Sequence, residues 1–577
     1  MSHEIPRIEK TADGGHQMVV NGKPFLMLGA ELQNSSMTSA DYMKATWPKL
    51  KAMNINTILG CVTWEMIEPN EGNFDFAELD EVIYDARDHD LHLILLWFGS
   101  FKNGQPTSLY ICYQKKSILT LQTGKSTYVP SWVKKDARRF PRAKLRKAGG
   151  RLETTEVLSI FHSEARAADI KAFERLIQHI KDIDEKNSTV IMVQVENEVG
   201  LLGDSRDGSE VANKRFSEPV PKTFVDTINK EWDNLHPSLR SNLSTFKALS
   251  APSDSSWSAT FGDSPQTDEI FMAYNYALYL EAIAQAGKSI YSLPLYTNVW
   301  QNMPNAATTS ASGGNTPGEY PSGGGVPHVI DIWQLFAPTL SFIAPDTYLN
   351  DYAQCCADYS HRKQPLMIPE QRRDAHGARR IWCALGTYQA LCTAPFGIDT
   401  LEPADCAFAS HYSLLKSVRA HVLKAQSSPH ISKGFFFDTF DVGSPDPSPP
   451  TTVTFGEWEL TISRSFVFGH PSEGYGMVIA MDDNSKFLLI GQGFQVGFRS
   501  RKPSATFSGI LSFLEKEVVN EETGELRTCK MLNGDETQSG RVCIMPSDSP
   551  DYGDFPICIT IPARTRIAEA VPYCLEE

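Results

Sequence analysis

Eight short runs of apolar and β-branched residues alternate with longer amphipathic segments over the first 425 residues. The runs lie at 25–32, 55–64, 91–99, 189–197, 293–300, 340–348, 364–371 and 392–399. Their apolar residues are nearly continuous, which is typical of strands buried on both faces of a parallel sheet. Eight such runs, each followed by a helical pattern, predict an α/β fold of the (β/α)8 TIM barrel type with insertions.

The segments between the runs show helical periodicity. Within 168–183, apolar side chains recur every three or four positions, as on the buried face of a helix. The segment 39–53 opens with Ser39 as an N-cap and carries Pro48 in its middle. Further helices are expected near 76–90, 268–288, 352–362, 374–391 and 404–425.

The pattern changes from about residue 430. Strand-like pieces separated by Gly, Asn, Asp and Pro replace the helical segments, which predicts a C-terminal antiparallel β-sandwich. These pieces lie at 434–440, 458–469, 475–481, 486–498 and 556–561. The Pro/Ser-rich stretch 442–452 is either a linker or a long loop inside the sandwich. We predict a catalytic barrel over 1–428 and an accessory sandwich over 429–577.

The charge composition of the chain limits the kinds of partner that it can bind. The formal net charge is -15, from Lys+Arg 54 and Asp+Glu 69, with no basic tract. Nucleic acids and anionic membranes need clustered Lys and Arg, so we expect neither as a partner. No apolar run reaches the length of a membrane span, and the polar start "MSHEIPRIEK" is unlike a signal peptide. We expect a cytoplasmic protein, unless an N-terminal signal is missing, and the oligomeric state stays undetermined.

The chemistry of a barrel of this type lies at the carboxyl ends of its strands. The residues that the sequence places there are carboxylates, amides and aromatics, which suit a neutral, hydroxyl-rich ligand such as a sugar. The candidate binding residues are Glu31, Asn34, Trp64, Lys102, Asn197, Asn298 and Tyr348. Trp64 and Tyr348 are either sugar contacts or core aromatics, and Lys102 is either a cleft residue or a solvated lysine.

Two glutamates lie in "MVQVENEVG" (192–200). Side chains of a strand alternate, so Glu196 and Glu198 share a face and Asn197 points away, unless the strand breaks there. Glu198 lies further out, whereas we expect Glu196 to pair with Arg or Lys inside the barrel. Glu370, after Pro369, is the candidate partner of Glu198. Two carboxyl groups about 5 Å apart are what a retaining glycosidase needs.

Three motifs carry a resemblance to a known family. "VQVENEVG", "PLMIPEQ" and "VTWEMIEPNEGNFDF" (62–76) resemble retaining barrel glycosidases, most closely the β-galactosidases of glycoside hydrolase family 35. The resemblance covers most of 20–425. It implies Glu198 as the acid/base, Glu370 as the nucleophile and Asn197 as a donor to the sugar 2-hydroxyl. The implied reaction is retaining exo-hydrolysis of terminal β-linked galactose.

The chain departs from that family at two strand ends. "GAELQNSS" stands where the family usually reads like "GEIHY", and "WEMIEP" stands where it has "WNxHEP". These changes affect sugar specificity and fit a divergent branch acting on galactose side chains of a plant polysaccharide such as xyloglucan. The alternatives are a β-arabinopyranosidase or β-glucosidase, or a catalytically silent sugar-binding barrel.

Other motifs do not reach a functional pattern. "TGKST" (123–127) has Leu119 where a phosphate loop needs glycine, and His89 and His92 straddle a helix end and a strand start. We therefore expect no metal and no organic cofactor. The segment 105–123 interrupts the region after the third strand, and it is either a genuine loop or translated intron sequence.

Overall fold

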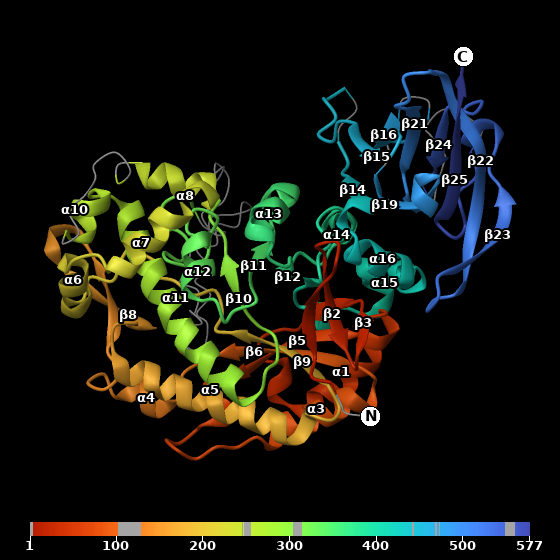
Figure 1. Cartoon of the computed structure of the whole chain (residues 1–577). Helices are drawn as coiled ribbons and strands as arrows, with labels where there is room; N and C mark the ends of the chain where they lie inside the picture. Colours follow the sequence, from red (N-terminus) through yellow and green to blue (C-terminus); the bar gives the residue numbers. More distant parts are fainter. Residues whose placement is uncertain are drawn as a thin grey trace.

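The computed structural model describes residues 4–101, 128–244, 246, 255–303, 314–440, 443–467, 470–471, 473–547 and 560–577. Two large parts are visible in Figure 1: a barrel built from the N-terminal and central residues, and a β-rich part built from the C-terminal residues. Lys102 and the interrupting segment 105–123 lie outside the described residues.

The barrel is a parallel sheet that closes on itself. In the described part of the chain its eight strands are β4 (Gly29–Glu31), β5 (Thr57–Thr63), β6 (His92–Phe98), β9 (Val190–Val195), β10 (Leu295–Trp300), β11 (Phe342–Thr347), β12 (Ile368–Gln371) and β13 (Thr393–Pro395). A parallel bridge between Glu31 and Phe396 joins the first strand to the segment after the last. Each of the eight predicted runs contains one strand, so the predicted TIM barrel is confirmed.

Helices surround the barrel (Figure 1). They are α1 (Ala40–Ala52), α2 (Trp64–Ile67), α3 (Ala77–Asp88), α4 (Ser131–Lys135), α5 (Ser163–Asp184), α6 (Glu210–Ser217), α7 (Lys222–Glu231), α8 (Pro237–Asn242), α10 (Trp257–Phe261), α11 (Pro265–Ile290), α12 (Ile330–Phe336), α13 (Tyr352–Tyr359), α14 (Ala375–Thr387), α15 (Ala407–Ser417) and α16 (Arg419–Ser427). Ser39 caps α1 as predicted, because its hydroxyl accepts from the Tyr42 backbone N–H at 3.2 Å. Pro48 lies inside this helix.

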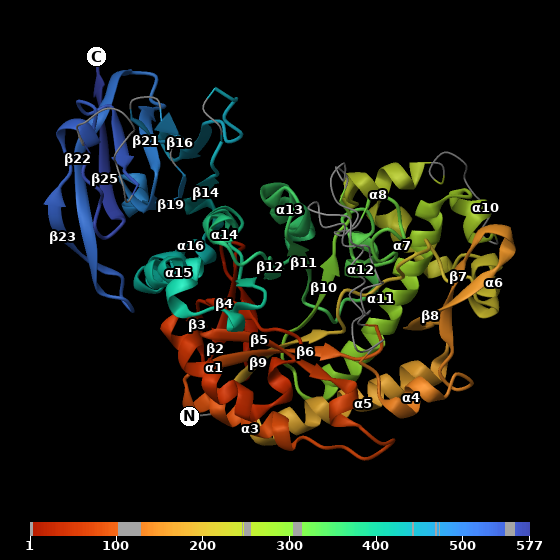
Figure 2. The ribbon, with the colours of Figure 1, turned by 180° about the vertical axis from the view of Figure 1, so that it is seen from behind.

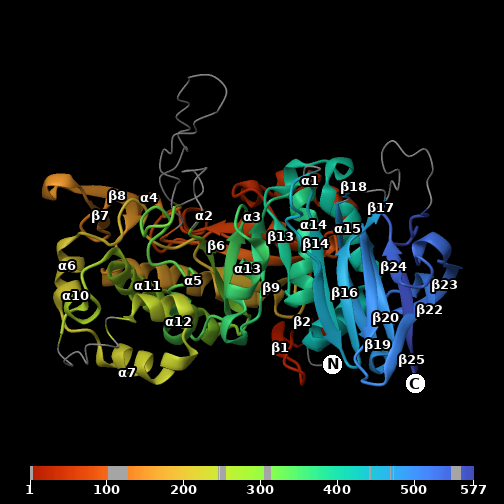
Figure 3. The same ribbon diagram turned by 90° about the horizontal axis from the view of Figure 1, so that it is seen from above.

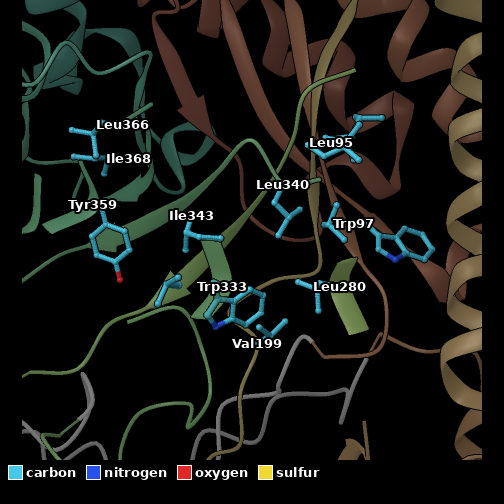
Figure 4. Close-up of a cluster of buried hydrophobic side chains, with 14 of the residues drawn as sticks. Leu95, Trp97, Val199, Leu280, Trp333, Leu340, Ile343, Tyr359, Leu366 and Ile368 are labelled. Carbon is cyan, nitrogen blue, oxygen red and sulfur yellow. The ribbon is translucent and has the colours of Figure 1, made fainter. Parts of the chain in front are cut away.

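The main core lies between the strands and the helices. Figure 4 shows Leu280 and Trp333 from the helices beside Ile343 from β11. A smaller apolar cluster is formed largely by side chains of the barrel strands, and it also includes Met18 and Val20. These two belong to β2 (His16–Val20), which pairs with β1 (Arg7–Lys10) and β3 (Lys23–Phe25) in a small antiparallel sheet that the sequence did not predict.

An antiparallel hairpin of β7 (Arg142–Arg146) and β8 (Leu152–Leu158) follows β6 in the chain. Figure 2 shows it beside α6, away from the C-terminal domain. Arg146 of the hairpin forms ion pairs with Asp204 (2.6 Å) and Asp268 (2.7 Å). These pairs connect the hairpin to α11 and to the segment after β9.

The C-terminal residues form two antiparallel sheets, so the predicted sandwich is confirmed. Within the described residues, one sheet has the order β14 (Ser432–Phe437), β19 (Gly474–Met481), β20 (Lys486–Gln492), β25 (Ile567–Glu576), β22 (Ala505–Asn520), β23 (Glu525–Met531). The other has the order β15 (Thr451–Phe455), β16 (Trp458–Arg464), β21 (Phe494–Ser500), β24 (Val542–Met545), and β17 (Phe466–Val467) pairs with β18 (His470–Pro471). Side chains of both sheets share one apolar core.

The sandwich packs against α14 of the barrel (Figure 3). The Thr387 hydroxyl donates to the Gly434 carbonyl at 2.6 Å, and the Ser432 hydroxyl donates to the Gly386 carbonyl at 2.8 Å. The predicted boundary at 428/429 falls between α16 and β14 and stays a prediction. None of the helices in the described ranges is both long and apolar enough to cross a membrane.

Candidate active site

Three carboxyl groups meet at the carboxyl ends of the barrel strands. One carboxylate oxygen from each of Glu198, Asp346 and Glu370 lies within 4.8 Å of the other two. Asp346 and Glu370 are register partners on the neighbouring strands β11 and β12, which explains their proximity. Glu198 and Glu370 are half-buried and Asp346 is buried. The structure therefore brings the two glutamates that the sequence paired into one cluster.

The turn that carries Glu198 is not an extended strand. β9 ends at Val195, and Glu196 and Glu198 have left-handed backbone angles, with φ of 61° and 44°. Left-handed residues interrupt the alternation of a strand. The strand breaks here, so the exception stated for this stretch applies, and Glu196 and Glu198 do not share a face. Instead the Asn197 amide donates to Glu198 Oε2 at 3.3 Å, so these two side chains lie together.

Glu196 points toward β6 and α5. Its Oε1 accepts from the Ser100 backbone N–H at 2.9 Å and its Oε2 from the Phe101 N–H at 3.0 Å. Burial and the neighbouring Asp169 carboxylate raise the pKa of Glu196 well above its usual value. The predicted Arg or Lys partner is wrong within the described residues, because Asp169 of α5 occupies that side. Glu196 is a structural residue, as expected, but as one half of an acid pair.

Asn298 at the end of β10 organises the cluster. Its Oδ1 accepts from the Glu198 backbone N–H at 2.8 Å. Its Nδ2 donates to Asp346 Oδ2 at 2.8 Å and to Asn197 Oδ1 at 3.2 Å. Gln194 also donates to Asn197 Oδ1, at 2.9 Å. Two of the three asparagines that the sequence singled out, Asn197 and Asn298, thus lie beside the carboxyl groups, and both are buried.

Tyr348 contacts the candidate nucleophile. Its hydroxyl donates to Glu370 Oε1. Burial and the negative charge of Glu370 raise the pKa of Tyr348 far above its usual value, with smaller contributions from Glu31 and Asp346. Tyr348 therefore keeps its proton and remains a donor to Glu370. Glu31, at the end of β4, is buried and lies near enough to affect this hydroxyl.

Two other predicted binding residues, Trp64 and Asn34, contact other partners. Trp64 has no exposed surface; its indole N–H donates to Glu68 Oε2 at 2.7 Å, and its ring lies edge-on to Trp132. A side chain enclosed in this way cannot stack on a sugar, so the structure places Trp64 in the core. Asn34 is half-buried, and its Oδ1 faces the Cys61 thiol at 3.7 Å.

Asp346 and Asp169 are site residues that are absent from the residues predicted from the sequence. Asp346 lies near the carboxyl end of the predicted strand 340–348, and this position is the signal by which the sequence could have identified it. Asp169 occupies a buried position of α5, where it interrupts the apolar face formed by Phe173 and Leu176. A carboxyl group on an apolar helical face is a signal of a buried polar contact.

The three carboxyl groups are also a donor set that a hard cation could use. Two of their oxygens already accept hydrogen bonds, Asp346 Oδ2 from Asn298 and Glu370 Oε1 from Tyr348. The expectation of a metal-free and cofactor-free reaction stays a prediction.

Known proteins resemble parts of the chain. A β-galactosidase of Xanthomonas manihotis is 32% identical over 84 residues, covering 14% of each chain. The β-galactosidase-1-like protein 3 of Rattus norvegicus is 28% identical over 251 residues, covering 43% of this chain and 34% of the relative. The solved β-galactosidase of Bacillus circulans sp. alkalophilus matches with a TM-score of 0.41 at 14% identity, over 68% of this chain and 56% of that one. The sequence matches span about a third or less of the relatives' own length.

Residues 36–311 match the profile of the family Glyco_hydro_42, described as beta-galactosidase. The chain carries a β-galactosidase-like glycoside hydrolase barrel. This profile names family 42, whereas the motifs resemble family 35. Residues 408–543 match a second family model, a domain of unknown function, DUF5597. That match extends from α15 across most of the sandwich.

Proposed function

We propose that the β-galactosidase-like barrel is a retaining exo-glycosidase that removes terminal β-linked galactose. The observation that carries the proposal is the approach of Glu198 and Glu370, whose nearest carboxylate oxygens lie within 4.8 Å. Inverting enzymes keep their carboxyl groups roughly 6.5–9.5 Å apart to admit a water molecule, whereas retaining enzymes hold them at about 5–5.5 Å. This proximity also favours catalysis over a silent sugar-binding role.

In this proposal, a Glu370 oxygen attacks the anomeric carbon while the Glu198 carboxylic acid protonates the departing glycosidic oxygen. The sugar is then esterified to Glu370 and Glu198 is a carboxylate. Glu198 next takes a proton from water as the water oxygen attacks the same carbon, which releases Glu370. Each of the two steps inverts the configuration at the anomeric carbon, so the released sugar retains the original configuration. Tyr348 orients the nucleophile through its hydrogen bond.

Asn197 has the position expected of a sugar-binding amide, since its Nδ2 lies 3.3 Å from Glu198 Oε2. In the proposed site this amide donates to the sugar 2-hydroxyl, a contact that strengthens at the transition state. Gln194 and Asn298 hold the Asn197 carbonyl oxygen, which fixes the amide orientation.

Galactose as the substrate is supported by three of the matched names: the profile is described as beta-galactosidase, and the relatives of Xanthomonas manihotis and Rattus norvegicus are named as a β-galactosidase and a β-galactosidase-1-like protein. Membership of family 35 is part of the proposal and rests on the three motifs. The sandwich (429–577) is proposed as an accessory domain. β-Arabinopyranosides and β-glucosides remain the alternative substrates, and galactose side chains of a polysaccharide such as xyloglucan are the proposed natural target.

The test is hydrolysis of 4-nitrophenyl β-galactoside, β-glucoside and arabinopyranoside, with the anomeric product followed by NMR. We expect the β-galactoside to react fastest and the β-anomer to appear first. Glu370→Ala is expected to abolish turnover. Wild-type turnover by this variant, or first release of the α-anomer, would overturn the mechanism.

A further inference from the structure

A cavity of about 590 Å³ opens beside the candidate nucleophile. Its walls come from the segments that follow β4, β11, β12 and β13, and they include Gln33, Tyr348, Arg373 and Phe396. Tyr348 connects this cavity with the carboxyl cluster, because its hydroxyl donates to Glu370. Glu370 itself does not line the cavity, so Tyr348 and the neighbouring Gln371 are the residues that connect a ligand there with the proposed point of attack.

The cavity wall carries two arginines, Arg372 and Arg373, which differ in their partners. Arg372 forms an ion pair with Asp374, Nη2 to Oδ2 at 2.5 Å, so these two charges offset each other. Arg373 Nη1 instead donates to the Gly397 carbonyl and the Thr400 hydroxyl, which are neutral acceptors. Asp399 lies between these two acceptors in the chain, but its carboxylate accepts from the Gln33 backbone N–H at 3.1 Å and the Ser36 hydroxyl at 2.5 Å, and across the described residues no ion pair involves Arg373.

A second donor lies beside this guanidinium. Gly397 has a left-handed φ of 68°, and a Cβ built on it would lie 2.7 Å from Gln33 Nε2 and 3.6 Å from Arg373 Nη1. The Gln33 amide and the Arg373 guanidinium therefore lie on either side of Gly397. Its two contacts hold Arg373 in place, which lowers the entropy lost when the remaining N–H groups bind a ligand.

The electrostatics favour an anionic ligand group at this wall. Glu198, Asp346 and Glu370 form an acidic centre that repels a negative substituent. The cavity wall offers a guanidinium, whose planar donors match carboxylate and sulfate oxygens. A neutral galactoside carries no negative group that could pair with this guanidinium.

We propose that the cavity selects an acidic sugar, in which a carboxylate or a sulfate ester on the ring held at Glu370 faces Arg373 and Gln33. This inference rests on the proposed function, because it names the substrate class of the same site. It changes the expected substrate from a neutral galactoside to its hexuronic or sulfated counterpart.

The kinetic test compares 4-nitrophenyl β-D-galacturonide, 4-nitrophenyl 6-sulfo-β-D-galactoside and the neutral 4-nitrophenyl β-D-galactoside. We expect a higher kcat/KM for at least one anionic substrate, and the better of the two identifies the source of the charge. Arg373→Gln removes the charge but keeps N–H donors. It is expected to lower kcat/KM for the preferred anionic substrate about 10- to 100-fold. The change for the neutral galactoside should stay below about threefold.

Arg372→Gln is the matched comparison, since it removes the same charge from the same wall. The Arg372 charge is already offset by Asp374, so we expect a smaller loss than for Arg373→Gln. Equal losses in the two variants, equal losses on charged and neutral substrates, or a preference for the neutral galactoside would each overturn the proposal.

A binding measurement separates this inference from the proposed reaction. Calorimetry with galacturonate, galactose 6-sulfate and galactose needs no turnover. Preferential binding of an anionic sugar that Arg373→Gln abolishes would support the acidic-sugar site even if no glycoside is hydrolysed. Turnover of neutral galactosides, together with equal binding of all three sugars, would instead retain the glycosidase and overturn the acidic-sugar site.

Discussion

Glu196 and Asp169 share a hydrogen bond in a fully buried position behind the turn that carries Glu198. Asp169 also accepts from the Trp97 indole at 3.0 Å and the Ser100 hydroxyl at 2.6 Å. Because Glu196 accepts from two backbone N–H groups after β6, the pair joins α5, β6 and the turn after β9. Burial raises the pKa of both carboxyl groups, and the charge of Asp169 raises that of Glu196 further.

Glu196→Ala is expected to lower stability and activity together. The substitution leaves the Ser100 and Phe101 N–H groups buried without an acceptor, at a cost of about 1–3 kcal/mol for each group. Glu196→Gln keeps one acceptor and a donor toward Asp169, so it should lose less on both counts. Urea unfolding and aryl galactoside turnover measure the two effects. A Gln variant as damaged as the Ala variant would contradict this role.

The same pair predicts that stability falls with rising pH. A carboxyl group whose pKa is raised by folding binds more protons in the folded state, so its contribution is complete below the unfolded value of about 4.3. It is then lost as pH rises through the folded value. We expect the free energy of unfolding to decline above about pH 5 in the wild type and less steeply in Glu196→Gln. Glu81→Gln, on the exposed face of α3, is the control and should leave the slope unchanged.

Glu198→Gln should slow the hydrolysis of substrates with poor leaving groups more than that of substrates with good ones. The variant cannot protonate the glycosidic oxygen, and general acid catalysis contributes about 10²–10⁴-fold. Methyl β-galactoside needs that proton, whereas 2,4-dinitrophenyl β-galactoside departs without it. We expect at least a tenfold larger loss of kcat/KM for the methyl glycoside. Equal losses would show that Glu198 is not the acid; Glu370→Gln should lose both activities.

Tyr348→Phe is expected to lower kcat about 10- to 100-fold, because it removes a hydrogen bond to a charged nucleophile worth about 1.5–3 kcal/mol. The fold should be unaffected, since the ring is kept. Tyr359→Phe is the matched control: Tyr359 of α13 donates to the carbonyl of Gly325, in the segment between β10 and α12, at 3.2 Å. Steady-state kinetics and thermal melting of both variants check this. Unchanged kcat in Tyr348→Phe would separate that hydroxyl from catalysis.

Gly434→Ala should destabilise the contact between barrel and sandwich. A Cβ at Gly434 would lie 1.8 Å from the Trp382 carbonyl oxygen, so α14 and β14 would have to separate. Overpacking of this kind costs about 1–3 kcal/mol. Gly497→Ala, in the sandwich strand β21, meets nothing closer than the Val542 methyl at 3.9 Å and is the control. Equal melting temperatures for the two variants would show that this contact adds no stability.

The barrel could be predicted because a strand buried on both faces needs a continuous apolar run, and the chain contains eight such runs. Glu370 and Asn298 followed directly, since the carboxyl ends of parallel strands meet at one edge. The N-terminal strands β1 to β3 were missed, because short antiparallel strands leave little period in the sequence.

The sequence by itself indicated the eight barrel strands, the antiparallel sandwich and the two glutamates at strand ends, since each follows from local patterns of residues. Only the tertiary structure decided what Glu196 and Trp64 do. Left-handed backbone at Glu196 turned its side chain toward Asp169, 27 positions earlier in the chain, and packing enclosed Trp64 against Trp132. Such outcomes depend on contacts between distant segments, which no local pattern of residues encodes.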